Sequence, residues 1–199
     1  MTTVVCVASG PSLTTEQTQI VEAARQVGRC RVIVVNDNYR LLPDADVLYA
    51  ADFKWWRHHW PQIDRDFRGE CWTQDRKAAT QYGLCFIQSA PKPGLSRDKR
   101  LIHTGSNSGY QAINLAYHFG ARRIVLIGYD MHREGGRKGR AHWFGDHPEG
   151  FGQADRPQEW APYFERLRAE LEAEGVECVN CTIRTALTWR RAALADVLA

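Results

Sequence analysis

The sequence lacks any run of about 18 apolar residues, and this absence predicts that no helix of the chain crosses a membrane. It also lacks a basic N-terminal segment, because an apolar strand pattern begins at once, so we expect no signal peptide. A cytoplasmic location is the expectation that follows from these two absences. Internal repeats, low-complexity tracts and linkers are missing too, and 199 residues suit one α/β domain with a full core.

A large net charge is missing as well, because 26 Lys and Arg residues nearly balance 23 Asp and Glu residues, which leaves +3. That value is too small to indicate a nucleic-acid partner by itself. The basic residues are nevertheless concentrated in two loops, where any contact with nucleic acid is expected. The first group is Lys92, Arg97, Lys99 and Arg100, and the second is Arg133, Arg137, Lys138 and Arg140.

The six cysteines show little sign of a metal site. Cys178 and Cys181 have the spacing of a zinc or redox pair, but no second pair lies nearby. They also fall within a predicted strand, where reduced and buried thiols are commoner. We therefore expect buried free thiols at these positions ahead of a structural zinc ion.

The segment around which the chain is organised is residues 3–13, TVVCVASGPSL. Its β-branched run stops at Ser9-Gly10-Pro11-Ser12 and a helical pattern opens soon after, which predicts a strand, a tight turn and a helix. Gly10 lets a ligand approach the backbone, and the free N–H groups at the start of a helix suit a phosphate. An ordinary capped turn is the alternative, because the segment is neither G-x-G-x-x-G nor a Walker A motif.

The remaining pattern alternates apolar strands with amphipathic helices, which predicts a single α/β domain with a mostly parallel sheet flanked by helices. A helix over 53–67 is expected to break near Pro61, and residues 89–104 are expected to form a loop. Strands are predicted over 31–35, 47–50, 71–73, 84–88, 123–128 and 176–181, and further helices over 16–27, 110–119, 159–174 and 186–198.

A second small, polar turn, TGSNSG, occupies residues 104–109 and leads into the helix predicted over 110–119. Asn107, Ser108 and Gly109 stand directly before that helix. Two such turns in one α/β domain can converge on a single anion. The sequence therefore predicts a phosphate ligand held between this turn and the Gly10 turn.

Polar residues also follow several strands, at the ends where an open α/β sheet places its ligand contacts. Asn36 follows the second strand, Asp52 the third, and Tyr129-Asp130 the strand over 123–128. A carboxylate in the last position commonly meets a ribose hydroxyl, a metal ion or a substrate proton. Turn chemistry alone is the alternative explanation for the Asn and Asp residues.

A lid-like, irregular loop is predicted near residues 132–152, rich in Gly, Arg and His. It carries the segment His142-Trp-Phe-Gly-Asp146-His147-Pro. His and Asp at this density suit a divalent metal or proton transfer. The competing interpretation is a surface loop whose polar residues have no joint role.

Three motifs together resemble two related families. Gly10-Pro-Ser-Leu resembles the G-P-S-L loop of the bacterial lipooligosaccharide sialyltransferases and of the MptE-like 6-hydroxymethylpterin diphosphokinases. Residues 35–39, VNDNY, are similar to the end of the sialyltransferases' second strand. The S-G helix at Ser108-Gly109 and the G-x-D strand end at Gly128-Tyr-Asp130 are similar to features that both families share. The resemblance covers about two thirds of the chain.

The resemblance implies a Rossmann-like sheet that binds an activated nucleotide or nucleotide-sugar. Gly10 and Ser12 would then approach phosphate or ribose, and Asn36 would face the base or its sugar. The residues implied to complete the cleft are Ser108, Gly109 and Asp130. The diphosphokinases are expected to need Mg²⁺, for which Asp52 and Asp130 are the candidate ligands.

Two segments depart from these families. The sialyltransferases carry a catalytic histidine before their S-G motif, and His103 precedes Ser108 here, although its surroundings do not match. The segment from His142 to Pro148 has no counterpart in either family. We interpret it as a feature of a phage- or prophage-like subgroup that sets the substrate.

The leading hypothesis is a transferase that takes a group from a nucleotide-linked donor, with glycosyl transfer ahead of diphosphate transfer from ATP. Such an enzyme needs groups that stabilise the leaving phosphate and a base for the acceptor hydroxyl. The cofactor-binding candidates are Ser9, Gly10, Pro11, Ser12, Asn36, Asn107, Ser108, Gly109, Tyr129 and Asp130. The catalytic candidates are His142, Asp146, His147 and His103, with Asp130 as a further candidate base.

Two other functions stay open. A nucleic-acid-binding or nucleic-acid-modifying protein would use the two basic loops and stack bases on Trp55, Trp56 and Trp143. Tryptophans outside the strands, Trp60 and Trp160 included, are expected to line a cleft. A non-catalytic module that kept the fold is the third hypothesis, and Asp130→Asn and His147→Ala would leave such a module unaffected.

Overall fold

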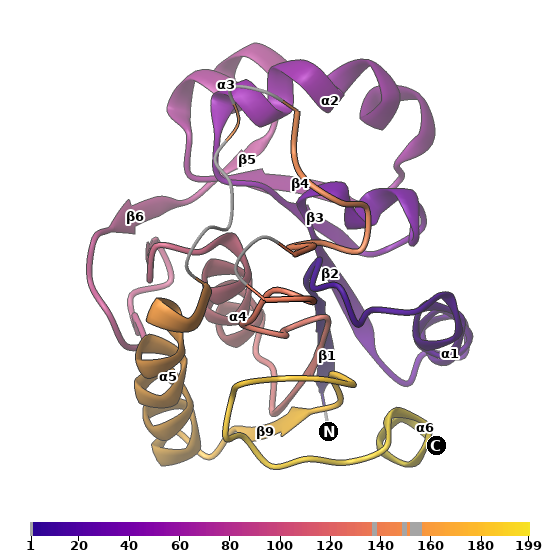
Figure 1. The fold of residues 1–199 in the computed structure, drawn as a ribbon. Helices are drawn as coiled ribbons and strands as arrows, with labels where there is room; N and C mark the ends of the chain where they lie inside the picture. Colours follow the sequence, from indigo (N-terminus) through magenta and orange to yellow (C-terminus); the bar gives the residue numbers. More distant parts are fainter. Residues whose placement is uncertain (1, 137–138, 149–150, 152–156) are drawn as a thin grey trace.

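A seven-stranded parallel sheet forms the centre of the protein (Figure 1). The computed structural model describes residues 2–136, 139–148, 151 and 157–199. The strand order is β5-β4-β3-β2-β1-β8-β9, and every pairing in the sheet is parallel. The strands are β1 (Thr3–Val7), β2 (Arg31–Val35), β3 (Val47–Tyr49), β4 (Glu70–Thr73), β5 (Cys85–Phe86), β8 (Arg123–Ile127) and β9 (Glu177–Asn180). This arrangement confirms the predicted single α/β, Rossmann-like fold.

Helices cover both faces of the sheet (Figure 1). The α-helices are α1 (Thr15–Gln26), α2 (Phe53–Asp66), α3 (Arg76–Tyr82), α4 (Ser108–His118), α5 (Ala161–Ala173) and α6 (Leu194–Leu198), and the 3-10 helices are η1 (Asn36–Arg40) and η2 (Pro157–Trp160). Along β1, Val4 and Cys6 pack with α4 and α5, whereas Val5 and Val7 pack with α1, α2 and α6. A central strand buried on both faces explains the nearly continuous apolar runs.

The structure corrects the prediction for two helices. The predicted helix over 186–198 is only α6, because the backbone before it bonds to other elements: Ala186 N–H donates to Asp130 O, and Asn180 N–H donates to Arg190 O. The predicted break near Pro61 is wrong, because α2 is continuous through it. Burial of Trp56 and Ile63 on either side holds the helix despite the missing donor.

A small sheet and a helix lie mostly where no regular structure was predicted. The expected loop over 89–104 contains most of a two-stranded parallel sheet, β6 (Gln88–Ala90) and β7 (Leu101–His103). Helix α3 was not predicted, although Asp75 caps its start and Gly83 ends it with a left-handed backbone. Within the part of the chain that the structure describes, no helix is long and apolar enough to span a bilayer.

Candidate functional site

A cavity of about 510 Å³ lies at the carboxyl ends of the central strands. Its walls come from the segments that follow β1, β2, β3 and β8, from the start of α4, and from the loop after residue 140. The Gly10 turn and the Ser108 turn both line it, as the sequence predicts. A volume of this size suits a small-molecule ligand.

Backbone strain is concentrated at this cavity. Asn36, Ser106 and Met131 have φ angles of 52°, 57° and 55°, and they are the non-glycine residues with positive φ among those described. All three line the cavity. A left-handed non-glycine residue costs of order 1 kcal/mol or more, and such residues gather at functional sites. Their position therefore marks the cavity as a candidate functional site.

The Gly10 turn uses its own backbone donors. Gly10 N–H donates to Gly128 O at 2.8 Å, and Leu13 N–H donates to Gly10 O at 3.1 Å. Ser12 N–H donates to Asp130 Oδ2 at 3.0 Å, and the proline between Gly10 and Ser12 has no N–H. These donors are therefore not free for a phosphate, which changes the role that the sequence predicts for this turn.

Asp130 gives this side of the cavity an acceptor. The residue is 1% exposed, and its Oδ1 atom has no hydrogen-bond partner among the described residues. A Cβ on Gly10 would lie 2.0 Å from that oxygen, so glycine is what lets the carboxylate fit. Burial raises the pKa of Asp130, while the bonds from Ser12 oppose the shift. Buried polar atoms usually have hydrogen-bond partners, so the unpartnered Oδ1 atom makes Asp130 a candidate ligand contact.

The start of α4 presents donors instead. Asn107 caps the helix by accepting from Tyr110 N–H at 3.1 Å. The N–H groups of Ser108 and Gly109 belong to the first turn and have no acceptor within the helix. Both residues line the cavity, and no acidic residue stands in the first turn of α4. Together with the helix dipole, these donors suit an anion.

The start of α2 lines the same cavity, which the sequence analysis did not anticipate. Asp52 stands at the N-cap position without a side-chain capping bond, and burial followed by the charge of Asp75 raises its pKa. Lys54, in the first turn, lines the cavity with its Nζ atom 5.2 Å from the centroid of the Phe151 ring. The sequence signal for this second helix start with free N–H groups was the helical pattern that begins directly after Asp52, behind β3.

Ser9 and His142 form a hydrogen-bonded pair at the acceptor side. The Ser9 Oγ atom lies 2.9 Å from His142 Nδ1, and Trp143 N–H donates to Ser9 O at 3.0 Å. Burial lowers the pKa of His142 to about 4, so its imidazole is neutral at neutral pH. Its Nε2 atom has no hydrogen-bond partner among the described residues. When Nδ1–H donates to Ser9, Nε2 carries a lone pair that can accept a proton.

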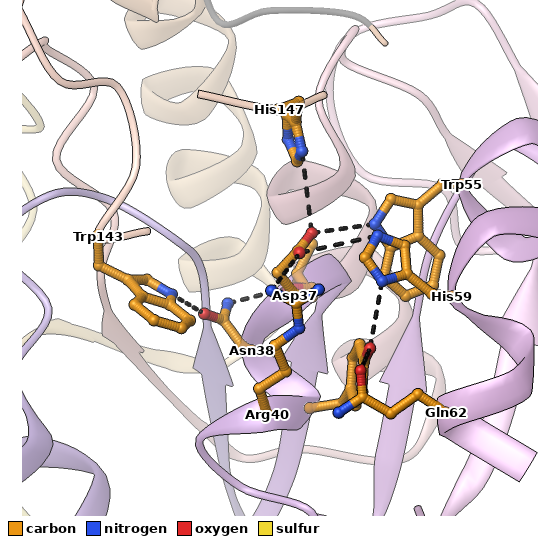
Figure 2. Close-up of polar contacts among 10 residues, drawn as sticks. Asp37, Asn38, Arg40, Trp55, His59, Gln62, Trp143 and His147 are labelled. Atoms are coloured by element: carbon orange, nitrogen blue, oxygen red, sulfur yellow. Dashed lines mark hydrogen bonds and ion pairs between the residues drawn. The ribbon is translucent and has the colours of Figure 1, made fainter. Parts of the chain in front are cut away.

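A buried carboxylate, Asp37, faces His147 of the same loop (Figure 2). His147 lines the cavity with its Nδ1 atom 3.9 Å from Asp37 Oδ2. The rings of His142 and His147 have centroids 4.7 Å apart. Burial lowers the pKa of His147, whereas the charge of Asp37 acts in the opposite direction.

Several predicted site residues lie outside the cavity lining. Pro11 and Ser12 belong to the turn behind it, and Tyr129 is buried, with its hydroxyl donating to Gly109 O at 3.0 Å. Asp146 is exposed and pairs with Arg133 at 3.2 Å. These residues support the cavity or face away from it rather than lining it.

His103 also lies away from the cavity, on β7, where Nδ1–H donates to Gly94 O at 3.2 Å. The two candidate metal ligands, Asp52 and Asp130, both line the cavity. No group of three or more His, Cys, Asp or Glu side chains among the described residues is arranged to hold a metal ion.

The cysteines are free, and burial raises the pKa of Cys178 to about 12 and that of Cys181 to about 11. The expectation that Trp56 lines a cleft is wrong, because it is fully buried with its indole N–H on Ala50 O. Trp60 and Trp143 do not line the cavity either. The tryptophans that do are Trp55 and Trp160.

Arginines of the two basic loops are engaged in ion pairs. Their partners are Glu174 for Arg97, Asp98 for Arg100, Asp146 for Arg133 and Glu134 for Arg140. Arg137 and Lys138 lie outside the described residues, as do 149–150 and 152 of the predicted lid-like loop. Pairing reduces the positive field that these loops offer to a polyanion.

A Rossmann-like fold hosts many unrelated activities, so function has to come from the chemistry of specific residues. No protein-family model matches the chain, and a search of curated proteins finds no matching relative.

Proposed function

We propose that the protein is a transferase that binds a nucleotide-linked donor in this cavity and transfers a glycosyl group to an acceptor hydroxyl. One observation carries the proposal: a single cavity of about 510 Å³ has backbone donors at the start of α4 and an unpartnered buried carboxylate oxygen at Asp130. A nucleotide-linked donor offers both matching groups, because it contains phosphate oxygens and sugar hydroxyls.

The donor's phosphate lies at the start of α4 in this proposal. Ser108 and Gly109, at the start of α4, and Lys54, in the first turn of α2, all line the cavity. When the bond to the transferred group breaks, negative charge grows on the leaving phosphate. Fixed donors stabilise that charge without reorganising, which is a large contribution to catalysis in group transfer.

The acceptor's proton goes to His142. Its Nε2 atom has no hydrogen-bond partner among the described residues, and the hydrogen bond with Ser9 fixes the ring, which is the geometry that a general base needs. The acceptor oxygen then forms the new bond, the nucleotide leaves with the electron pair of the broken bond, and the proton remains on Nε2. His103 does not line the cavity and does not serve this role.

Diphosphate transfer from ATP is the second candidate, favoured by the two carboxylates, Asp52 and Asp130, in the cavity lining. Mg²⁺ is usually held by one or two carboxylates together with substrate phosphates, so these two residues fit a cation that arrives with ATP. The bound ion would neutralise charge on the phosphates. The α4 donors and Lys54 would serve in the same way as for glycosyl transfer.

Nucleotide binding is tested by thermal unfolding with CMP, CDP, UDP, ADP and ATP, each with and without Mg²⁺. A ligand at 100 times its dissociation constant adds about 2.7 kcal/mol to stability, which raises the unfolding midpoint measurably. The proposal is overturned when none of these nucleotides moves the midpoint.

The reaction class is tested by ³¹P NMR of product mixtures. Release of the nucleotide from a nucleotide-sugar marks glycosyl transfer, whereas formation of AMP from ATP marks diphosphate transfer. His142→Gln should lower kcat by about 100-fold or more, the contribution typical of a general base. His103→Gln is the matched control and should keep kcat. Equal losses in the two variants would remove His142 from the mechanism.

A further inference from the structure

The turn after β2 has two faces. Asn36 lines the cavity, whereas Asp37 and Asn38 are 3% and 0% exposed and do not line it. Figure 2 shows these two side chains directed toward Trp143 and His147 of the loop. In this one 3-10 helix, Asn36 therefore faces the cavity, whereas the next two residues contact the loop.

Asn38 joins the ends of two strands to the loop. Its Nδ2 donates to Val7 O at 2.8 Å and to Val35 O at 2.9 Å, and its Oδ1 accepts from Trp143 Nε1 at 2.8 Å. An aspartate lacks the two donors, and a leucine lacks all three groups. The amide thus uses both N–H donors on the sheet and its oxygen on the loop.

Asp37 is a buried carboxylate on which several elements converge. Its Oδ2 accepts from Trp55 Nε1 at 3.0 Å, and its Oδ1 lies 3.5 Å from Arg40 and 3.7 Å from His59 Nε2. His147 approaches Oδ2 from the loop at 3.9 Å. Burying a carboxylate is costly without such partners, so the cluster and the loop are coupled.

The loop segment is consequently held at three places. His142 is bonded to Ser9 Oγ, Trp143 to Ser9 O and to Asn38, and His147 lies against Asp37. We propose that Asp37 and Asn38 are positioning residues that clamp the 142–147 segment onto the ends of β1 and β2 and so aim His142 Nε2 at the ligand. The catalytic consequence rests on the proposed function, whereas the clamp itself does not.

The pH at which His147 titrates depends on the charged and titratable groups that face it, and this dependence can be used to test the clamp. Asp37, Arg40 and His59 face it from η1 and α2, and His142 and Asp146 from its own loop. Asp37→Asn keeps an acceptor for Trp55 and removes the negative charge. Because that charge favours the imidazolium, its removal should lower the pH at which His147 titrates.

The first experiment follows the histidine rings of the full chain by NMR as pH is varied. Asp37→Asn should shift the His147 midpoint downward, and Asp44→Asn, an exposed carboxylate at the opposite end of the sheet, should leave it in place. An unchanged His147 midpoint in Asp37→Asn would overturn the electrostatic half of the clamp.

The second experiment measures hydrogen exchange at the Trp143 backbone N–H, which is bonded to Ser9 O. Trp143→Phe removes the indole donor and keeps an aromatic ring, so exchange at position 143 should become faster. Trp72→Phe is the matched control, because its indole N–H bonds to the exposed Glu70 on β4. Equal exchange rates at position 143 in Trp143→Phe and the wild type would overturn the clamp.

Kinetics then separate the clamp from the proposed function. Asp37→Asn and Trp143→Phe should lower kcat by about 10- to 100-fold, because a small misplacement of a reacting group has that effect, while nucleotide affinity changes less than about twofold. If hydrogen exchange at the Trp143 N–H becomes faster but kcat is unchanged, the proposal that the clamp positions His142 for catalysis is refuted. If no form turns over a donor, the proposed function fails, and exchange and titration still decide on the clamp.

Discussion

The Gly10 turn and the start of α4 look alike in the sequence and face the same cavity, but they offer opposite chemistry. The first has committed its N–H groups to Gly128, Asp130 and its own turn, and it presents acceptors. At the start of α4, Tyr110 N–H donates to the Asn107 cap, and the N–H groups of Ser108 and Gly109 have no acceptor within the helix. A strand-turn-helix pattern alone therefore does not define an anion site. What matters is whether the backbone N–H groups of the turn already donate to other residues.

The difference arises from a residue that is distant in the sequence. Asp130 follows β8 and reaches Ser12 across 118 residues, so that β1's turn is bonded to its neighbouring strand end. At the start of α4 the capping acceptor is Asn107, which is adjacent in the sequence, and its side chain accepts from Tyr110 N–H. One turn therefore gains an acceptor for hydroxyls, and the other keeps donors for phosphate.

The largest expected effect is on the free energy of unfolding, and it distinguishes Gly10 from Gly109. In Gly10→Ala, the new Cβ would lie 2.0 Å from Asp130 Oδ1 and 2.5 Å from Gly128 O, which cannot all relax. The free energy of unfolding, measured in urea, should fall by about 3 kcal/mol. In Gly109→Ala the nearest atoms are 3.0 Å away, and the gain in helix propensity offsets the crowding. Similar losses in both variants would contradict the distinction.

The next effect concerns the unpartnered carboxylate. Asp130→Asn should weaken binding of a nucleotide-sugar by about 30-fold, close to 2 kcal/mol, because hydrogen bonds to charged groups contribute about 1.5–3 kcal/mol. Calorimetric titration measures the affinity, and Asp44→Asn is the charge control. Unchanged affinity in Asp130→Asn would place the ligand's hydroxyls elsewhere.

The same variant has a pH signature. Burial raises the pKa of Asp130 from its ordinary 3.8, so the folded state binds the proton more tightly than the unfolded state. The contribution of Asp130 to wild-type stability therefore falls as pH rises from 3.8 through the raised pKa. Asp130→Asn lacks this titration, so its stability relative to the wild type should improve across that window. Parallel stability curves for the two proteins in urea would argue against the raised pKa.

Removing the two helix caps has a smaller effect and compares the turns directly. Asn107 accepts from Tyr110 N–H, and Thr14 accepts from Gln17 N–H at 3.2 Å. Each substitution by alanine should lower the free energy of unfolding by about 1 kcal/mol. Only Asn107→Ala should also weaken nucleotide binding, because the donors beside it are the ones assigned to phosphate. Weaker binding in Thr14→Ala instead would reverse the assignment.

The smallest expected effect lies in the basic loops. Arg100 pairs with Asp98 at 2.9 Å on the surface, and such exposed pairs contribute about 0–1 kcal/mol. Arg100→Gln should therefore leave stability within about 0.5 kcal/mol and nucleotide affinity unchanged. Retention on DNA should change little between low and moderate salt. A steep salt dependence would favour the nucleic-acid hypothesis over α4 as the anion site.

Local patterns predicted the sheet well because its strands are buried on both faces. The runs over 31–35 and 123–128 agree with β2 and β8 to within one residue at either end. The helix predicted over 186–198 was mostly wrong, because backbone groups of this segment form hydrogen bonds with distant residues instead. For the site, strand-end residues such as Asn36 and Asp130 were identifiable because parallel strands end at the same edge. Lys54 was not predicted, although it lies in the first turn of the helix that begins directly after Asp52.

The sequence by itself determined the α/β fold, the two turns and the polar residues at the strand ends, because apolar periodicity and turn chemistry are local properties. Only the tertiary structure decided which donors stayed free, that Asp130 meets the Gly10 turn, and that Asp37 and Asn38 face the loop instead of the ligand. Hydrogen bonds between residues more than 100 positions apart, such as Ser12 to Asp130, made those choices, and no local pattern encodes them.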